Sequence, residues 1–565
     1  MQTSLMKNLF LITLFSVLLL SCARVGSPVG GTKDSIAPNF VSSNIDSPRV
    51  NVPTDLKELR IHFDEYITLK EVSRNLIISP PIKYKRILPS GLGNKYIQIE
   101  WDEPLQENTT YNFNFGNSIV DLNEGNVLPY FNFAFSTGPE LDQLYISGDV
   151  FDGMKAQEEN LTMDSKNNYV IGLYKESDSI DYRQKPYYVT KADADGYFEL
   201  NYLSQGTYRI IAFKDENMNT VYDAGKEAVG FRKDPIVLEQ SISGIPIYIY
   251  PSKKPFKYLE GKEVAGGILM TFEGQPKSVE IKSLTEKLKD YKVTHKANSD
   301  SVNVWFDAEK QDIGISQNDR LQLSYNADGN QDTVFVSYRK TIKDEMTLAS
   351  AFSTVPPKKD FEIISNYPLE NINTQSWTLN SDSISRPFTA KISEANPNKI
   401  LVSSNFEIGK KYELTVPSKT VNSFYKTTDK AYQFNFEIDK AENYGKLTLN
   451  LENKPDAKFW IQFLNEGNEV LFSKFTDEAQ HQFNELKPAT YKLRILVDNN
   501  GNGIWDEADF LNHTFAEDVY LFPKKIEIRP LWENVETWNL GTNTTGTPVN
   551  KGLENVPPLK EEAEN

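Results

Sequence analysis

A run of carboxylate and amide side chains follows an apolar strand pattern near the end of the chain. Side-chain oxygens stand at positions 1, 3, 5, 9 and 12 of this loop, with glycine at position 6, as in a calcium-binding loop. The main-chain carbonyl at position 7 would complete the ligand set. The candidate calcium ligands are Asp498, Asn500, Asn502, Ile504, Asp506 and Asp509. The alternative is a polar turn in which Asn and Gly supply left-handed backbone and local hydrogen bonds.

An earlier loop has the same pattern, always 283 residues before the later one, as from Asp215 to Asp498. Coincidences at one offset indicate an internal duplication. The earlier loop departs from the spacing, because Thr220 stands at the glycine position and Lys226 at position 12. Its candidate ligands, a weaker set, are Asp215, Asn217, Asn219, Asp223 and Glu227.

The element that must position the later loop is a strand over residues 490–497. Tyr491 and Leu493 alternate with Lys492 and Arg494, which is the period of a half-buried strand with a polar face. Because a strand and not a helix precedes the loop, an EF-hand is not implied. Bound calcium would therefore rigidify a connection between strands.

Composition limits the class of protein. A chain of 565 residues is too long for one core, and 12% aromatic residues with only 7 Met favour β-sheet. A net charge of −17 argues against nucleic acid as a partner. The 4 His have no ligand spacing, and no nucleophile elbow, phosphate loop or dinucleotide fingerprint is present. We therefore predict a protein that is not an enzyme and has no organic cofactor.

The N-terminus has the pattern of an export signal. A lysine precedes an apolar run that ends in Leu19, Leu20, Ser21 and Cys22, the only cysteine in the chain. This pattern resembles a bacterial lipoprotein signal with its lipobox, so residues 1–21 would be removed and Cys22 would carry the acyl chains, palmitate among them. Ala23 then favours the outer membrane. The surface face is favoured over the periplasmic face, although the acidic run usual after the cysteine of Bacteroidota surface lipoproteins is missing.

Several short alternating strands follow, which is typical of a β-sandwich. The segments LRIHFDEYI (59–67), IISP (77–80) and FNFAFST (131–137) resemble the bacterial Ig-like domain of S-layer proteins. The lead-in over residues 30–34 resembles a family of Bacteroidota lipoproteins. The resemblance implies a sandwich in the cell envelope and supplies no catalytic residues.

The remaining chain divides into further β modules. The sequence over 195–208, with Asp-Gly before Phe and Gly before Tyr, resembles transthyretin-like and collagen-adhesin B-type modules, which serve as spacers. The predicted fold class is all-β, with tandem Ig-like and transthyretin-like β-sandwich modules. The predicted divisions are a signal peptide (1–21), a tether (22–37), an Ig-like domain (38–138), a transthyretin-like sandwich (140–250), a β domain of uncertain type (256–354), a degenerate Ig-like domain (360–438), a second transthyretin-like sandwich (439–540) and a disordered tail (541–565).

Five Asp-Ser/Thr-apolar triplets resemble the O-glycosylation sequon of Bacteroidota, which would again indicate the envelope. Their hydroxyl residues are Ser35, Ser179, Ser301, Thr333 and Ser383.

Together these patterns predict a non-catalytic outer-membrane lipoprotein that acts as a scaffold or interaction subunit. It would be held by its lipid and would bind outer-membrane or surface proteins as an accessory to an assembly, secretion or uptake machine, since extended β rods offer strand edges and loops to partners. Two alternatives remain open: a carbohydrate-binding or adhesive surface lipoprotein with a glycan as its partner, and a hydrolase with a cryptic site.

Overall fold

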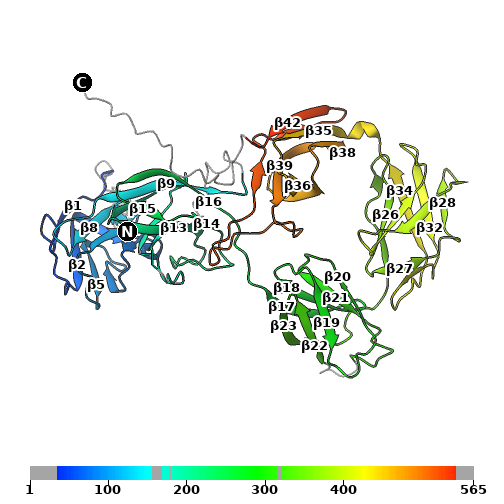
Figure 1. Cartoon of the computed structure of the whole chain (residues 1–565), viewed down its shortest axis with the longest axis horizontal. Helices are drawn as coiled ribbons and strands as arrows, with labels where there is room; N and C mark the ends of the chain where they lie inside the picture. Colours follow the sequence, from blue (N-terminus) through cyan, green and yellow to red (C-terminus); the bar gives the residue numbers. More distant parts are fainter. Residues whose placement is uncertain (1–34, 156–167, 178–179, 315–319, 542–565) are drawn as a thin grey trace, which may run out of the picture. The chain divides into compact units, whose positions relative to one another are not determined.

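The computed structural model describes residues 35–155, 168–177, 180–314 and 320–541 (Figure 1). Strands dominate these ranges, and their helical elements are α2 (Val72–Asn75) and the 3-10 turn η1 (Ala441–Asn443). No helix in the described ranges is long and apolar enough to cross a membrane. The all-β fold class is therefore confirmed. Cys22, Ser179 and the predicted tail from residue 542 lie outside the described residues.

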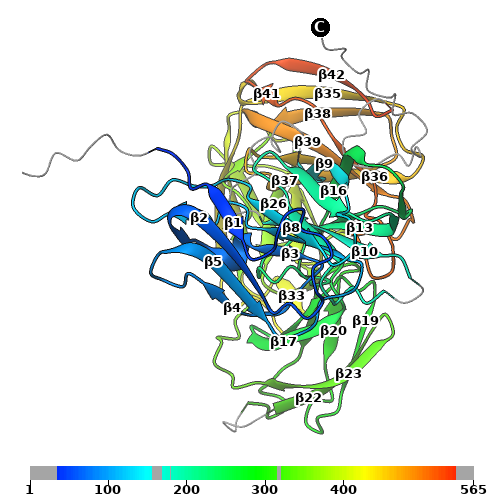
Figure 2. The ribbon, with the colours of Figure 1, turned by 90° about the vertical axis from the view of Figure 1, so that its left-hand side faces the viewer.

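The chain divides into two compact units, one up to Asp142 and one from Gln143. The first unit packs the sheet β1-β2-β5-β4, with β7 on β2, against the sheet β3-β6-β8. Figure 2 shows β1, β2, β5 and β4 in blue. Alternate residues of both sheets, among them Ile61, Trp101 and Phe113, point into one apolar core. The strands are β1 (Phe40–Ser43), β2 (Glu58–Leu69), β3 (Ile77–Ser79), β4 (Tyr84–Leu88), β5 (Asn94–Trp101), β6 (Thr110–Asn114), β7 (Ile119–Asp121) and β8 (Asn132–Ser136).

The second unit begins with what we call the β9–β16 sandwich. One sheet has the order β12-β9-β16, with β16 parallel to β9, and the other has the order β11-β10-β13-β14, with β15 also on β13. The strands are β9 (Leu144–Asp152), β10 (Tyr169–Lys175), β11 (Tyr188–Lys191), β12 (Tyr197–Leu203), β13 (Gly206–Lys214), β14 (Val229–Phe231), β15 (Ile236–Leu238) and β16 (Ile242–Ile249).

The same unit ends with the β35–β42 sandwich, which has the same topology strand for strand. Its sheets are β38-β35-β42, with β42 parallel to β35, and β37-β36-β39-β40, with β41 also on β39. This equivalence confirms the duplication. The strands are β35 (Gly445–Glu452), β36 (Lys458–Leu464), β37 (Val470–Thr476), β38 (Gln480–Leu486), β39 (Ala489–Asp498), β40 (Val519–Leu521), β41 (Ile526–Ile528) and β42 (Glu533–Asn539).

In the sequence, the β17–β23 sandwich follows the first of these copies. It is the region whose fold type the sequence left uncertain. Its sheets β17-β18-β21-β20 and β19-β22-β23 enclose one core, and the predicted hairpin through Asp328 and Gly329 is confirmed as β22 and β23. The strands are β17 (Lys257–Val264), β18 (Gly267–Glu273), β19 (Val279–Ser283), β20 (Lys292–His295), β21 (Ser301–Trp305), β22 (Arg320–Ala327) and β23 (Asn330–Ser337).

The β24–β34 sandwich follows and repeats the first unit. In each, the closing strand pairs with the strand two places before it in the chain, as β8 with β6 and β34 with β32. The backbone N–H five residues before a buried tyrosine donates to its hydroxyl at 2.8 Å in both, Gln106 to Tyr111 and Glu407 to Tyr412. The strands are β24 (Leu348–Ser350), β25 (Thr354–Val355), β26 (Phe361–Ser365), β27 (Leu369–Ile372), β28 (Thr378–Ser381), β29 (Ile384–Ser385), β30 (Thr389–Ile392), β31 (Lys399–Ser403), β32 (Lys411–Val416), β33 (Val421–Ser423) and β34 (Tyr432–Ile438).

One sequence expectation about β39 is wrong. Its second face was expected to meet solvent, but Arg494 and Leu496 on that face are buried. Arg494 donates from Nε and Nη2 to Gln462 Oε1 at 2.9 and 2.6 Å. The amide oxygen of Gln462 on the neighbouring strand β36 therefore allows the Arg494 side chain to be buried. The alternation of residues within β39 does not reveal this partner.

Candidate functional site

The later Asp/Asn loop is organised by the carboxylate at its first position. Asp498 is buried at the end of β39, and its two oxygens accept hydrogen bonds from the backbone N–H groups of Asn502 (3.0 Å) and Gly503 (2.9 Å). The side-chain amides of Asn500 and Asn502 both donate to Asp506 Oδ2 at 2.6 Å. The structure thus brings the first, third, fifth and ninth positions of the predicted site together.

Sequence reasoning missed a carboxylate that closes this loop. The two oxygens of Glu517 accept from the backbone N–H of Asn500 (3.1 Å) and of Asp506 (3.0 Å), so one side chain ties both ends of the loop. Glu517 is buried, and this burial raises its pKa. It lies far beyond the twelve positions of a calcium loop, and only its equivalence to Glu227 in the other copy could have revealed it.

The earlier loop repeats this arrangement. Asp215 is buried and accepts from the N–H of Asn219 (3.1 Å) and Thr220 (3.0 Å). Glu227 accepts from the N–H of Glu216 (3.0 Å) and Asp223 (2.9 Å). Burial, with smaller contributions from the charges of Asp215 and Asp223, raises the pKa of Glu227 to about 7. Among the described contacts, the Asp215, Asp223 and Glu227 carboxylates have no side-chain cation as a partner, whereas Glu216 pairs with Lys214 at 3.5 Å.

The remaining predicted ligands lie apart from this cluster or face other partners. Asp509 accepts from the backbone and side chain of Asn512, and the N–H of Ile504 donates to Asn502 Oδ1. Asn217 donates to Asp223 Oδ2 at 2.5 Å in the earlier loop. Among the described residues, no group of three or more His, Cys, Asp or Glu is placed to hold a metal ion. Calcium therefore stays a prediction.

The later loop carries an insertion that the earlier one lacks. The offset between the copies rises from 283 residues at Asp215 and Asp498 to 290 at Val229 and Val519, so seven extra residues precede β40. The segment 507–516 that contains them docks on the β9–β16 sandwich. The N–H of Ala508 donates to the carbonyl of Pro251 (3.0 Å), and the N–H of Lys253 donates to the carbonyl of Ala508 (2.8 Å).

Aromatic side chains fill the same contact. Phe510, which is 2% exposed, packs against Tyr182, Tyr222 and Phe231 at centroid distances of 4.5, 5.7 and 5.1 Å. Phe515 stacks on Phe231 at 4.6 Å. The two copies of the duplicated sandwich are thereby joined directly, although two other sandwiches separate them in sequence. We call this contact the clasp.

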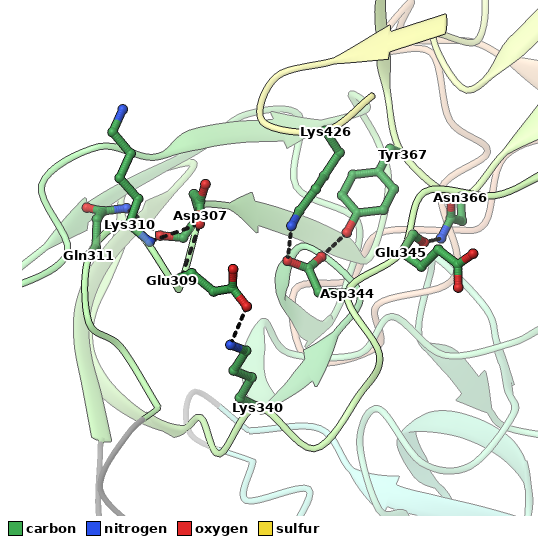
Figure 3. Close-up of polar contacts among 10 residues, drawn as sticks. All are labelled: Asp307, Glu309, Lys310, Gln311, Lys340, Asp344, Glu345, Asn366, Tyr367 and Lys426. Atoms are coloured by element: carbon green, nitrogen blue, oxygen red, sulfur yellow. Dashed lines mark hydrogen bonds and ion pairs between the residues drawn. The ribbon is translucent and has the colours of Figure 1, made fainter. Parts of the chain in front are cut away.

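A second joint links the β17–β23 and β24–β34 sandwiches (Figure 3). Asp344, between them in sequence, pairs with Lys426 Nζ at 2.8 Å and accepts a hydrogen bond from the Tyr367 hydroxyl. Burial and this hydrogen bond raise the pKa of Tyr367, so it stays protonated and donates. Burial disfavours the Lys426 ammonium, but the hydrogen bond and charge of Asp344 more than offset this and raise its pKa.

An aromatic plug fills the apolar part of this joint. Trp305, at the end of β21, packs on Tyr367 at 5.4 Å and belongs to the core of the β24–β34 sandwich. Gly266 allows this approach, because a Cβ there would lie 2.2 Å from the Tyr367 ring. Tyr425 also donates to Asp290 across the joint at 2.9 Å. The chain between these two sandwiches is therefore held by side chains from both.

The predicted glycosylation residues occupy varied surroundings. Ser35, Thr333 and Ser383 are exposed, whereas Ser301 is half-buried at the start of β21. Three of the four described sites are thus accessible to a modifying enzyme.

One protein-family model matches part of this chain. A model described as bacterial Ig-like domain matches residues 34–137. The described part of this range, from residue 35, is therefore a bacterial Ig-like domain. No curated protein sequence matches the chain.

Solved structures that align with the chain include an S-layer protein and a pilin subunit. The TIE protein of Bacillus anthracis is 10% identical and covers 90% of this chain and 75% of its own, with a TM-score of 0.12. The surface layer protein SbsC is 13% identical over 87% of this chain and 67% of its own, with a TM-score of 0.14. BcpA, the major pilin subunit of Bacillus cereus, is 10% identical over 70% and 99%, with a TM-score of 0.13. Likeness at this level gives no information on function.

Proposed function

We propose that this protein is a non-catalytic scaffold, lipid-anchored through Cys22 to the outer membrane of a bacterium of the Bacteroidota. In this role it is an accessory subunit of an outer-membrane assembly, secretion or uptake machine. Its Ig-like domain and its lipobox both suit the cell envelope, and the surface face is the favoured side of the membrane.

The observation that carries the proposal is the way the sandwiches are joined. The clasp buries Ala508 and Phe510, and the second joint buries Trp305 and Tyr367. A chain of independent binding modules needs only linkers between them, whereas a scaffold must hold its modules in fixed relation. Buried aromatic side chains at both joints, together with the half-buried ion pair of Asp344 and Lys426 at the second, supply that fixation.

The Asp/Asn loops contribute to the same role. We propose that calcium binds within the later loop through Asp498 and Asp506, with Asn500 and Asn502 as neutral oxygen ligands. The loop that would hold the ion leads directly into the clasp, so binding would stiffen the connection between the two copies. The earlier loop, with Asp215, Asp223 and Glu227, would bind more weakly because Thr220 replaces its glycine.

The experiment is a crosslinked, detergent-solubilised pull-down of the tagged lipoprotein from its own membranes, with mass spectrometric identification. Stoichiometric recovery of a β-barrel outer-membrane protein is expected, and loss of that partner from a Phe510→Ala variant would tie the interaction to the clasp. Recovery of the lipoprotein alone would overturn the machine role and direct the search to glycan arrays.

Lipidation is tested separately with Cys22→Ser. Fractionation is expected to move the protein out of the membrane pellet, because the only acylation site is removed. Continued membrane association of this variant would contradict the lipid anchor and leave the scaffold role to the pull-down.

A further inference from the structure

The free edge of the β35–β42 sandwich differs from the equivalent edge of its sister copy. β37 is the terminal strand of the order β37-β36-β39-β40, and within the described residues it pairs with β36 alone. It is seven residues long and contains no proline. Val470, Leu471 and Phe475 on it are 47%, 51% and 43% exposed. Long apolar edges of this kind are templates for another strand, and proteins normally shorten, charge or cover them.

The equivalent edge strand of the β9–β16 sandwich, β11, is short and buried. β11 occupies the same place in the order β11-β10-β13-β14 but is four residues long. Tyr188, Val189 and Thr190 on it are all buried. Because the two copies share their topology, the exposed apolar edge is a feature that one copy has and the other lacks. It is therefore not a consequence of the fold.

The outer face of β37 continues into a stacked aromatic pair. Phe475 stacks on Trp460 of β36 with ring centroids 4.4 Å apart, and Lys458 lies over the Phe475 ring at 5.9 Å. Phe475 is therefore held in place by its neighbour while much of its ring still faces solvent. A pre-positioned aromatic at an open edge suits an interface anchor, because little side-chain freedom is lost on binding.

We propose that β37 pairs antiparallel with β37 of a second copy of this chain, across a twofold axis at Ser473. Ser473 is the central residue of the strand, so this register places Leu471 opposite Phe475 of the second copy and Phe475 opposite its Leu471. Both pairs lie on the exposed outer face, since residues two apart share a face. Aliphatic–aromatic pairs of this type stabilise neighbouring strands.

The strand's own sequence favours a second copy over an unrelated strand. In the twofold register Val470 meets Thr476, Phe472 meets Lys474, and no two like charges oppose each other. The only charged residue of the strand, Lys474, already pairs with Glu478 at 3.7 Å within its own chain. The same apolar residues of both copies would be buried by this pairing, as in an isologous interface. This inference does not depend on the proposed membrane machine.

The first test uses the axis residue in the full chain. Cα atoms directly opposite in an antiparallel pair are roughly 4.5 to 5.5 Å apart, within the range of a disulfide. Since Cys22 is the only native cysteine, Ser473→Cys in native membranes should give an oxidised dimer on a non-reducing gel. The matched control is Ser337→Cys, on the exposed outer end of β23, another edge strand. Equal dimer yields from both variants would overturn the proposal.

The second test measures association of the detergent-solubilised full chain by sedimentation. Phe475→Lys should raise the dimer dissociation constant by roughly tenfold or more, the effect of losing one interface anchor. Phe335→Lys, at a 60% exposed phenylalanine on β23, should leave it unchanged. Both sites are exposed, so circular dichroism should show intact folding for each. A wild-type chain that sediments as a monomer, or equal effects of the two variants, would overturn the proposal.

Discussion

The two Asp/Asn loops hold their first carboxylate with the same hydrogen bonds. They differ in the residue types at the left-handed backbone positions that these hydrogen bonds require. In the later loop the left-handed positions are Gly501 and Gly503, with φ of 71° and 84°. In the earlier loop the equivalent positions are Met218 and Thr220, with φ of 61° and 58°. Side chains with a Cβ are disfavoured in this region. The hydrogen bonds of the buried aspartate therefore outweigh local preference in the earlier copy.

The loops also differ in what surrounds them. Glu227 closes the earlier loop after a short turn, whereas Glu517 closes the later one after the seven-residue insertion that carries Phe510. The frame of carboxylates and backbone N–H groups is common to both copies, and the added residues form the clasp. The two copies thus share a hydrogen-bonded frame, and the longer loop of the later copy supplies the contact between them.

The largest expected effect comes from removing the shared frame. Asp215→Ala and Asp498→Ala each remove a buried carboxylate that accepts two backbone hydrogen bonds, at a cost of about 4 kcal/mol in local stability. Hydrogen exchange of the amides of β13 and β39 should show this loss in the copy that carries the substitution.

Asp509→Ala is the matched control, because among the described residues the Asp509 carboxylate accepts hydrogen bonds from Asn512 alone. A change within about 0.5 kcal/mol is expected without added calcium. If calcium stabilises the wild type and no longer stabilises Asp509→Ala, the twelfth position is a ligand after all. A small effect of Asp498→Ala would contradict the view that this carboxylate organises the loop.

The clasp is tested next with Phe510→Ala. Truncating a ring that is 2% exposed between three aromatic neighbours should weaken the contact by about 3 kcal/mol. Faster hydrogen exchange is expected in both 507–516 and β14, while β36 keeps its protection. Leu511→Ala changes the next residue, which is 48% exposed, and should alter neither region. Equal effects of the two substitutions would mean that the clasp does not hold the sandwiches together.

Much of this comparison could be predicted from the sequence. Alternating apolar residues place β13 and β39, and the constant offset between Asp215 and Asp498 shows the duplication, because both depend on local spacing. The clasp could not be predicted, since Phe510 finds its partners in another sandwich and no periodicity records them. Arg494 was misjudged for the same reason: its burial depends on a neighbouring strand. Glu517 was missed because an insertion breaks the spacing that relates it to Glu227.

The stability of the earlier copy should also depend on pH. The raised pKa of Glu227, about 7, means that between pH 4.5 and 7 the folded chain keeps a proton that the unfolded chain releases. Stability is therefore full below pH 4.5 and falls as the pH rises towards 7, by about 2 to 3 kcal/mol in total. Hydrogen exchange of β13 in a calcium chelator is the measurement, and Glu227→Gln should flatten the profile.

Calcium sharpens this test, because a bound cation favours the ionised carboxylate and should remove the pH-dependent loss. The exposed Glu239 provides the control, and Glu239→Gln should keep the wild-type profile. A profile that is unchanged by calcium would show that the earlier loop does not bind the ion at these carboxylates.

The smallest expected effect concerns the left-handed positions themselves. Thr220→Gly should stabilise the earlier loop by about 1 kcal/mol, because glycine relieves the Cβ strain at φ 58°, while Gly503→Thr should destabilise the later loop by a similar amount. Reciprocal changes in hydrogen exchange at β13 and β39 would show that the two copies differ only in local backbone strain at this position. If Thr220→Gly is destabilising instead, the Thr220 hydroxyl, which donates to the Asn219 carbonyl at 2.6 Å, contributes more than the strain costs. The earlier loop would then be adapted to threonine rather than a degraded version of the later one.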